Sequence, residues 1–178
     1  MKKFSISLIL LILFASSVVT VKGSSSVKVD IVTTVGEVID GDTFHTVNDT
    51  KIRFADIDAP ESYESGYQES KDFLASLVNG KSVYIDIDDV SRTDQYGRYI
   101  CLVLVKLNSS HFLNVNKAMV DNGYAVISDY TNNEFNPYAW STYYSENDVS
   151  VVPEFSRTAL LLLGLLTFSI IIIKRKRH

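Results

Sequence analysis

Between residues 27 and 148 the apolar residues fall into short segments, and in several of them every second side chain is apolar. This alternation is typical of strands that bury one face, so it limits the chain to a fold built from short strands. A denser apolar segment at residues 99–106 is typical of a central strand. The expected strands are residues 27–31, 36–39, 43–47, 51–57, 83–87 and 99–106.

Two helices are expected to interrupt these strands. Residues 67–78 carry apolar side chains on one helical side, and Asn79 and Gly80 supply a stop signal. Residues 114–122 repeat the helical spacing, and Gly123 follows where a left-handed C-cap residue is expected. Short strands with helices between them indicate an α+β fold that is mainly β, and we expect an OB-fold five-stranded barrel.

The segment after the second helix is expected to lie outside the barrel strands. Residues 132–140 are rich in Asn, Pro and aromatic residues, which predicts an ordered loop that packs Tyr138 and Trp140 on the barrel. Residues 141–152 are expected to be a linker. Cys101 is the single cysteine, so no intrachain disulfide can form, and its apolar surroundings predict a buried core residue rather than a nucleophile.

The N-terminal residues have the features of an export signal. Lys2 and Lys3 precede an apolar segment at residues 4–21, which is the order found in signal peptides. Cleavage is expected before Ser24, which leaves residues 1–23 as the signal peptide. An uncleaved anchor is the alternative, but the hydroxyl residues within the apolar segment favour cleavage.

The C-terminal residues have the pattern of a membrane tail. Residues 158–173 are apolar or nearly so, and four basic residues at 174–177 follow at once. This segment would cover about 24 Å as a helix, somewhat less than the ~30 Å hydrocarbon core of a bilayer. The basic residues are expected to stay in the cytoplasm, which places the domain at residues 27–148 outside the cell.

The motif before this tail resembles a known sorting signal. Val152-Pro153-Glu154-Phe155, a short apolar helix and a basic end follow one another as in the Pro-Glu-Phe sorting tails of archaeal surface proteins. The resemblance implies a sortase-like enzyme, besides signal peptidase, that replaces the tail with a lipid anchor. A plain tail anchor is the alternative. With either, residues 149–178 form a linker, sorting motif and transmembrane tail that hold a monomer at the extracellular face of the membrane.

Three short clusters carry the candidate chemistry. They are residues 38–43 (Val-Ile-Asp-Gly-Asp-Thr), 53–61 (Arg-Phe-Ala-Asp-Ile-Asp-Ala-Pro-Glu) and 92–98 (Arg-Thr-Asp-Gln-Tyr-Gly-Arg). The first two offer carboxylates on neighbouring strands, and Ca²⁺ accepts carboxylates, carbonyls and waters in flexible geometry. The chain has no Cys/His set for zinc and no EF-hand spacing. Residues 86–89 are a further acidic group, which we expect to be a solvated strand end rather than a site.

Arginine and glutamate complement such a cation. Cleavage of a phosphodiester builds negative charge on the phosphorus oxygens, and a planar guanidinium can hold two of these oxygens at once. A cation and two arginines would clamp this charge, and a nearby glutamate could accept a proton from the attacking water.

In their residues and in their order along the chain, the three clusters resemble motifs of the staphylococcal nuclease (thermonuclease) family. That family has an Asp-Gly-Asp-Thr strand, an Arg segment that ends in Asp-x-Pro-Glu, and a Thr-Asp-x-Tyr-Gly-Arg turn. The resemblance runs from about Val35 to Val126. It implies metal-assisted attack of water on phosphorus in DNA and/or RNA, with little sequence specificity and 3′-phosphate products.

The resemblance implies a calcium site and a residue that activates water. Asp42 and Asp58 would be metal carboxylates, and Ala59 would offer its backbone carbonyl. Glu61 would act as the general base or orient the water molecule.

The resemblance also implies the groups that hold the substrate. Arg53 and Arg98 would clamp the phosphate. Asp40 would support the metal loop, with an ordinary turn residue as the alternative. Tyr96 would contact a nucleotide phosphate, with an ordinary half-buried tyrosine as the alternative.

Two features depart from this family. Residues 27–150 hold nine Lys/Arg against twenty Asp/Glu, a formal charge of −11, whereas nucleic-acid affinity normally rests on a basic surface. The family's further tyrosines are also missing, since Asp129 and Thr131 stand near their positions. Two other functions therefore stay open: a catalytically weak OB-fold nucleic-acid-binding module, and a calcium-binding surface protein. Neither has a physical need for Glu61 together with two arginines.

Overall fold

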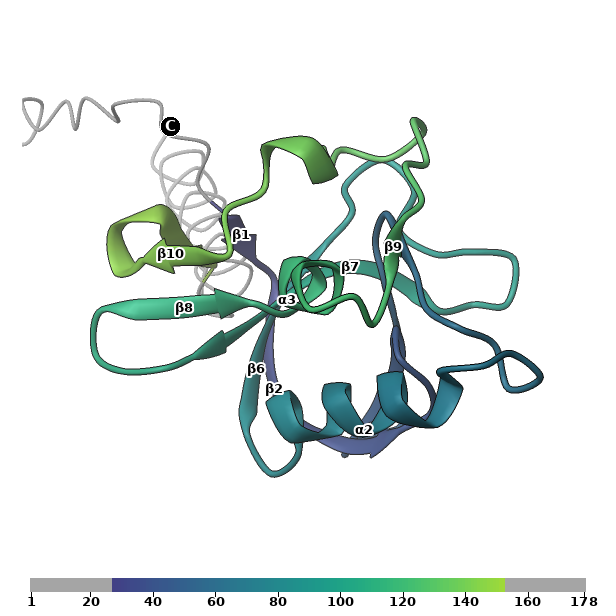
Figure 1. Cartoon of the computed structure of the whole chain (residues 1–178). Coiled ribbons are helices and arrows are strands. Elements are labelled where there is room, and N and C mark those ends of the chain that lie inside the picture. The colour runs from purple at the N-terminus through teal and green to yellow at the C-terminus, as the bar shows by residue number, and fades with distance from the viewer. Residues whose placement is uncertain (1–26, 153–178) are drawn as a thin grey trace, which may run out of the picture.

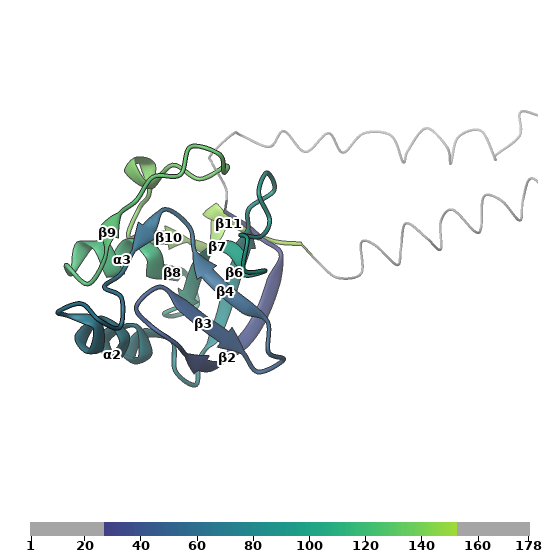
Figure 2. The same cartoon turned by 90° about the vertical axis from the view of Figure 1, so that its right-hand side faces the viewer.

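The computed structural model describes residues 27–152 (Figures 1 and 2). The expected signal peptide at residues 1–23 lies outside the described residues, as do residues 153–178 with most of the sorting motif and the apolar tail. Within the described part of the chain, no helix is both long and apolar enough to cross a membrane.

The chain forms the expected closed five-stranded barrel. Its strands are β2 (Ile31–Val38), β3 (Thr43–Thr46), β4 (Lys51–Phe54), β6 (Ser82–Ile87) and β7 (Tyr99–Lys106). Strands β2, β3 and β4 are antiparallel neighbours, β4 runs parallel to β7, and β6 pairs antiparallel with both β7 and β2, which closes the barrel. The prediction of an OB-fold that is mainly β with helices is therefore confirmed.

The two predicted helices are present. The first, α2 (Tyr67–Val78), has the predicted bounds and buries Leu74 and Val78 in the barrel core. The second, α3 (Val115–Asp121), begins after Asn114, whose side chain accepts a hydrogen bond from the Lys117 N–H. Gly123 follows this helix with φ 74°, as expected of a left-handed C-cap residue. Figure 1 shows α2 alongside β2 at one end of the barrel.

The segment expected to be one strand at residues 51–57 forms two. Strand β4 ends at Phe54, and β5 (Ile57–Asp58) pairs antiparallel with β9 (Val126–Ile127). Asp56 lies between them with φ 53°, a left-handed conformation that breaks an extended strand. The break brings the end of the second cluster next to the segment that follows α3.

A second apolar cluster lies on the outside of the barrel. It consists of Val27, Val29, Leu102, Leu104 and Phe112. Strand β1 (Val27–Val29) supplies two of these side chains and pairs in parallel with β11 (Val149–Val151). Trp140 packs against both clusters, as predicted, but the Tyr138 side chain is 73% exposed, so the prediction for Tyr138 is wrong.

The expected linker at residues 141–152 is instead largely folded. Strand β10 (Tyr143–Ser145) pairs antiparallel with β8 (His111–Asn114), and the 3₁₀ turn η2 (Glu146–Asp148) leads directly into β11. These strands have three residues each, which is too short for an alternating pattern to stand out in the sequence.

The acidic residues at 86–89 are not a solvated strand end. Asp86 and Asp88 are buried. The Asp88 carboxylate accepts hydrogen bonds from the N–H groups of Val90, Ser91 and Glu134, while Asp86 accepts one from the Lys28 N–H. Burial raises the pKa of Asp86 to about 7. Strand β1 and the segment around Glu134 cover this end of β6. Both lie more than forty residues away in the chain, so the sequence around residues 86–89 does not indicate that they cover it.

Candidate active site

The first cluster forms a tight turn between β2 and β3 that packs against α2. Asp40 Oδ1 accepts a hydrogen bond from the Asp42 N–H (3.0 Å), and Tyr67 Oη donates to the Ile39 carbonyl (3.0 Å). A Cβ atom on Gly41 would lie 1.8 Å from Ser70 Oγ, so only glycine fits at this point of closest approach to the helix. The contact of Asp40 is a local bond within the turn, which both support of a metal loop and an ordinary turn residue would give.

Arg53 joins the two expected metal carboxylates. Its Nη1 lies 3.0 Å from Asp42 Oδ2, and its Nη2 lies 3.1 Å from Asp58 Oδ1. The guanidinium also donates hydrogen bonds to the carbonyls of Phe54 (3.1 Å) and Ile57 (2.9 Å), so its position is fixed by the chain around it. Residues from the turn before β3, from β4 and from β5 therefore meet at one place.

The environment of Asp42 shifts the pKa of its carboxyl. Burial raises the pKa of this carboxyl to about 7, and Asp40 adds to the shift, although Arg53 and the hydrogen bonds from the Ala59 N–H (2.8 Å) and Thr43 Oγ1 (2.9 Å) oppose it. Burial therefore disfavours the ionised form of Asp42, and Arg53 is the positive charge in contact with it.

Oxygen donors from Asp42, Asp58 and the Ala59 carbonyl suit Ca²⁺, so these residues fit the metal that the resemblance implies. The residues described between 27 and 152 include no group of three or more His, Cys, Asp or Glu side chains that could hold a metal. Backbone carbonyl and water ligands would therefore have to complete the coordination.

Arg98 approaches the same centre from the turn before β7. Asp94 Oδ2 accepts a hydrogen bond from Arg98 Nε (2.7 Å), and Arg98 Nη1 lies 3.5 Å from Thr43 Oγ1, which itself donates to Asp42. Burial alone would raise the pKa of Asp94, but its hydrogen bonds with Arg98 and Tyr96 outweigh this and hold the pKa below its usual value. The Arg98 guanidinium also lies 5.3 Å from the centre of the Tyr96 ring.

Glu61 follows Asp58 by three residues in the chain but is not joined to these groups. It is exposed in the loop between β5 and α2, where its N–H donates to Glu64 Oε2 (2.8 Å). No hydrogen bond or ion pair links its carboxylate to the two arginines or to the two aspartates within the described chain. The structure thus connects four of the five expected catalytic and metal side chains, and leaves Glu61 free to face solvent or a substrate.

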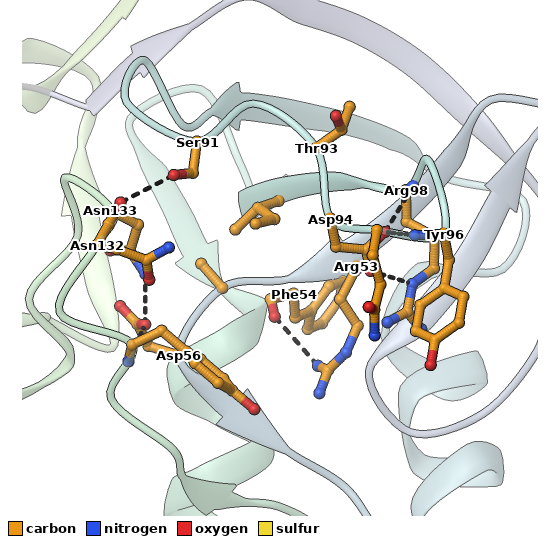
Figure 3. Close-up of a pocket in the computed structure, with 14 residues that line it drawn as sticks. Arg53, Phe54, Asp56, Ser91, Thr93, Asp94, Tyr96, Arg98, Asn132 and Asn133 are labelled. Atoms are coloured by element: carbon orange, nitrogen blue, oxygen red, sulfur yellow. Dashed lines mark hydrogen bonds and ion pairs between the residues drawn. The ribbon is translucent and has the colours of Figure 1, made fainter.

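A pocket of about 480 Å³ opens beside the two arginines (Figure 3). Arg53, Arg98 and Tyr96 line one side, and Asp56, Tyr130, Asn132 and Asn133 line another. No residue of the segment at 130–133 was predicted to belong to the site. The one sequence signal there is an aromatic residue followed by polar residues, which is common in surface loops.

Comparison with known proteins identifies the family. The profile of the family described as "Staphylococcal nuclease homologue" matches residues 51–148, which is more than half of the chain. The chain belongs to the staphylococcal nuclease homologue family. Arg53, Asp58, Glu61 and Arg98 lie within the matched residues of this nuclease homologue, whereas Asp42 precedes them.

Three curated proteins are similar to this staphylococcal nuclease homologue. Endonuclease YhcR of Bacillus subtilis is 32% identical over 107 residues, which are 51% of this chain and 8% of that protein. Protein ParB of Escherichia coli is 36% identical over 95 residues, 49% of this chain and 52% of ParB. A protein named an uncharacterized endonuclease in Escherichia coli is 34% identical over 100 residues, 54% of this chain and 61% of its own length. The chain thus spans less than two thirds of each of these relatives.

Proposed function

We propose that this protein is a calcium-dependent phosphodiesterase that hydrolyses DNA and/or RNA outside the cell with little sequence specificity and leaves 3′-phosphate products. The observation that carries this proposal is the hydrogen-bonded connection from Asp58 through Arg53 and Asp42 to Thr43 and Arg98. This connection supports the proposal, because it links two expected metal carboxylates and two guanidinium groups. The names of two relatives, both endonucleases, support the same reaction class.

In the proposed mechanism the scissile phosphate lies between the two arginines. Asp42, Asp58 and the Ala59 carbonyl would hold Ca²⁺, which supplies Lewis-acid polarisation of a phosphate oxygen. Arg53 and Arg98 bind phosphate oxygens as their negative charge grows. Asp94 keeps the Arg98 guanidinium oriented, through the 2.7 Å hydrogen bond to Nε.

Glu61 is proposed to remove a proton from the attacking water. Its carboxylate is exposed and not committed to another described residue, so it is available to a water molecule beside the phosphate. The water oxygen bonds to phosphorus as the bond from phosphorus to the 5′ oxygen breaks. The 5′ oxygen leaves and becomes a hydroxyl by taking up a proton, and the phosphate remains on the 3′ oxygen of the other fragment.

The pocket beside Arg53 and Arg98 is proposed to receive a nucleotide next to that phosphate. Tyr96 and Tyr130 line it, and their side chains are 69% and 54% exposed. Exposed aromatic rings stack on unpaired bases of any sequence, which favours single-stranded substrates and agrees with low sequence specificity. The two arginines that line the pocket are paired with Asp42, Asp58 and Asp94, so a bound Ca²⁺ would have to supply the further positive charge that a phosphate requires there.

The cellular context is part of the same proposal. The N-terminal segment would direct export through signal peptidase, and the C-terminal tail, or a lipid that a sortase-like enzyme attaches in its place, would hold a monomer at the outer face of the membrane. Supporting features are the two apolar segments and the basic residues that follow the second.

Cleavage of single-stranded DNA by the full-length protein tests the proposed reaction. We expect cleavage in Ca²⁺, none in excess chelator, and fragments whose 3′ ends become extendable only after phosphatase treatment. Glu61→Gln should lower kcat by about 10²- to 10⁴-fold, because the amide cannot accept the proton.

The matched control is Glu69→Gln, which makes the same change on an exposed residue in the first turn of α2 and should keep wild-type activity. Tight oligonucleotide binding without cleavage would instead indicate a binding module. Calcium binding with no effect on nucleic acid would indicate a calcium-binding surface protein.

A further inference from the structure

Asp56 is a buried acidic residue in a strained backbone conformation inside the pocket (Figure 3). Among the non-glycine residues from 27 to 152, Asp49 and Asp56 have positive φ, with values of 62° and 53°. Glycine adopts this region freely, whereas other residues are disfavoured there. An observed backbone outlier beside a candidate site gives reason to look for what its side chain does.

The side chain of Asp56 holds the opposite wall of the pocket. Its Oδ1 accepts hydrogen bonds from the Tyr130 N–H (3.0 Å) and from Asn133 Nδ2 (2.6 Å), and its backbone carbonyl accepts one from the Ser128 N–H (3.0 Å). Asp56 Oδ2 is buried without a hydrogen-bond partner among the described residues. Burial of this carboxyl therefore costs desolvation free energy, and its hydrogen bonds go to residues 128–133.

Few other bonds hold this wall. The segment has no regular secondary structure between β9 and the 3₁₀ turn η1 (Pro137–Ala139). Ser91 Oγ donates to the Asn132 carbonyl (3.0 Å). Directly after the wall, the Glu134 N–H donates to Asp88 Oδ1 (3.0 Å), and Glu134 Oε1 accepts from the Asp89 N–H (3.0 Å). Within residues 128–133, the remaining hydrogen bonds to the barrel are those to Asp56. The hydrogen bonds that tie Tyr130 and Asn133 themselves to the barrel therefore both end on Asp56.

We propose that Asp56 is a positioning residue for substrate binding, which fixes the wall at residues 128–133 at the distance from Arg53 and Arg98 that a bound nucleotide requires. This inference rests on the proposed function. Asp56 lies between Arg53 and Asp58 in the chain. One short segment would therefore carry the proposed phosphate-binding arginine, the residue that positions the pocket wall, and a proposed metal carboxylate. The reacting groups do not include Asp56 itself.

The test compares Asp56→Gly with Asp56→Asn in the full-length protein. Glycine suits the positive φ but removes the carboxyl, so we expect KM for a short single-stranded DNA to rise roughly tenfold, with kcat within about twofold of wild type. Deuterium uptake of the peptide at residues 128–134 should become faster. Asparagine keeps an oxygen acceptor at the Oδ1 position and tolerates positive φ, so the Asp56→Asn protein should have the same KM as wild type.

Asp49→Gly is the matched control, because Asp49 has the same backbone conformation but an exposed side chain in the turn between β3 and β4. It should change neither KM nor the deuterium uptake of residues 128–134. Should Asp56→Gly not fold, Asn133→Ala removes one of the same hydrogen bonds from the other side, and it should raise KM to a smaller extent.

The outcomes separate this inference from the proposed function. An unchanged KM in Asp56→Gly, a fall in kcat alone, or an Asp56→Asn variant as weak as Asp56→Gly would overturn the role of Asp56. A wild-type protein that does not cleave would overturn the proposed function instead. In that event, the affinity of a fluorescent oligonucleotide for the same variants, measured by fluorescence anisotropy, is compared in place of KM. Weaker binding by Asp56→Gly but not by Asp56→Asn would support the role of Asp56, and equal binding by all would overturn it.

Discussion

Replacing Arg98 by alanine is expected to lower kcat for single-stranded DNA about 10³-fold or more, the scale on which a phosphate-clamping arginine acts in phosphoryl transfer. The guanidinium lies between Asp94 and Thr43, close to Asp42 but outside the expected metal ligands. In the proposed mechanism, its loss would remove positive charge that stabilises the transition state, without removing an oxygen from the proposed calcium site.

The measurement is single-turnover cleavage, with Ca²⁺ affinity and melting temperature followed in parallel. Arg98→Lys should recover only a small part of the rate, because an ammonium group cannot hold two oxygens in one plane or keep the Nε bond to Asp94. Near-wild-type cleavage by Arg98→Ala would show that this side chain acts only in the structure of the turn.

Gly41→Ala is expected to destabilise the protein by about 3 kcal/mol and to weaken Ca²⁺ binding, because overpacking at a rigid contact displaces the backbone. The new Cβ would lie 1.8 Å from Ser70 Oγ and 2.7 Å from the Ala59 Cβ. Ser70 cannot move away freely, since its Oγ donates to the Tyr124 carbonyl (2.7 Å). The turn that carries Asp42 must shift instead.

Chemical denaturation and Ca²⁺ titration measure both effects. Gly80→Ala is the control: a Cβ atom on Gly80 would meet no other atom within 4 Å, so this replacement should cost only the strain of the positive φ. Adding Ser70→Gly to Gly41→Ala should restore part of the stability. A Gly41→Ala protein with wild-type stability and Ca²⁺ affinity would show that the turn is not held by this contact.

The parts of the fold that follow from local pattern were predicted from the sequence. The bounds of α2 and β7 match their predicted ranges, because a long periodic segment carries its own signal. Strands of three residues such as β10 and β11 carry no such signal, and their pairing with β8 and β1 is set by contacts far apart in the chain.

For the candidate site, the structure extends the sequence-based prediction in one place and shows a part of the pocket that the prediction missed. The residue sequences of the three clusters indicated which residues to expect in the site. The structure adds that Arg53 joins Asp42 to Asp58. The pocket wall at residues 128–133 was missed, because what brings it to the site is Asp56, a residue more than seventy positions earlier. A carboxylate that holds a distant loop has no local sequence signature.

The most direct test of the proposed calcium centre is a Ca²⁺ titration of the full-length protein and of Asp42→Asn, with calorimetric binding and DNA cleavage measured on the same samples. We expect binding and cleavage by the wild-type protein to rise over the same Ca²⁺ range, and Asp42→Asn to lose both. Cleavage that persists in chelator, or Asp42→Asn that binds Ca²⁺ as tightly as wild type, would contradict the assignment of this centre as a calcium-dependent phosphodiesterase site.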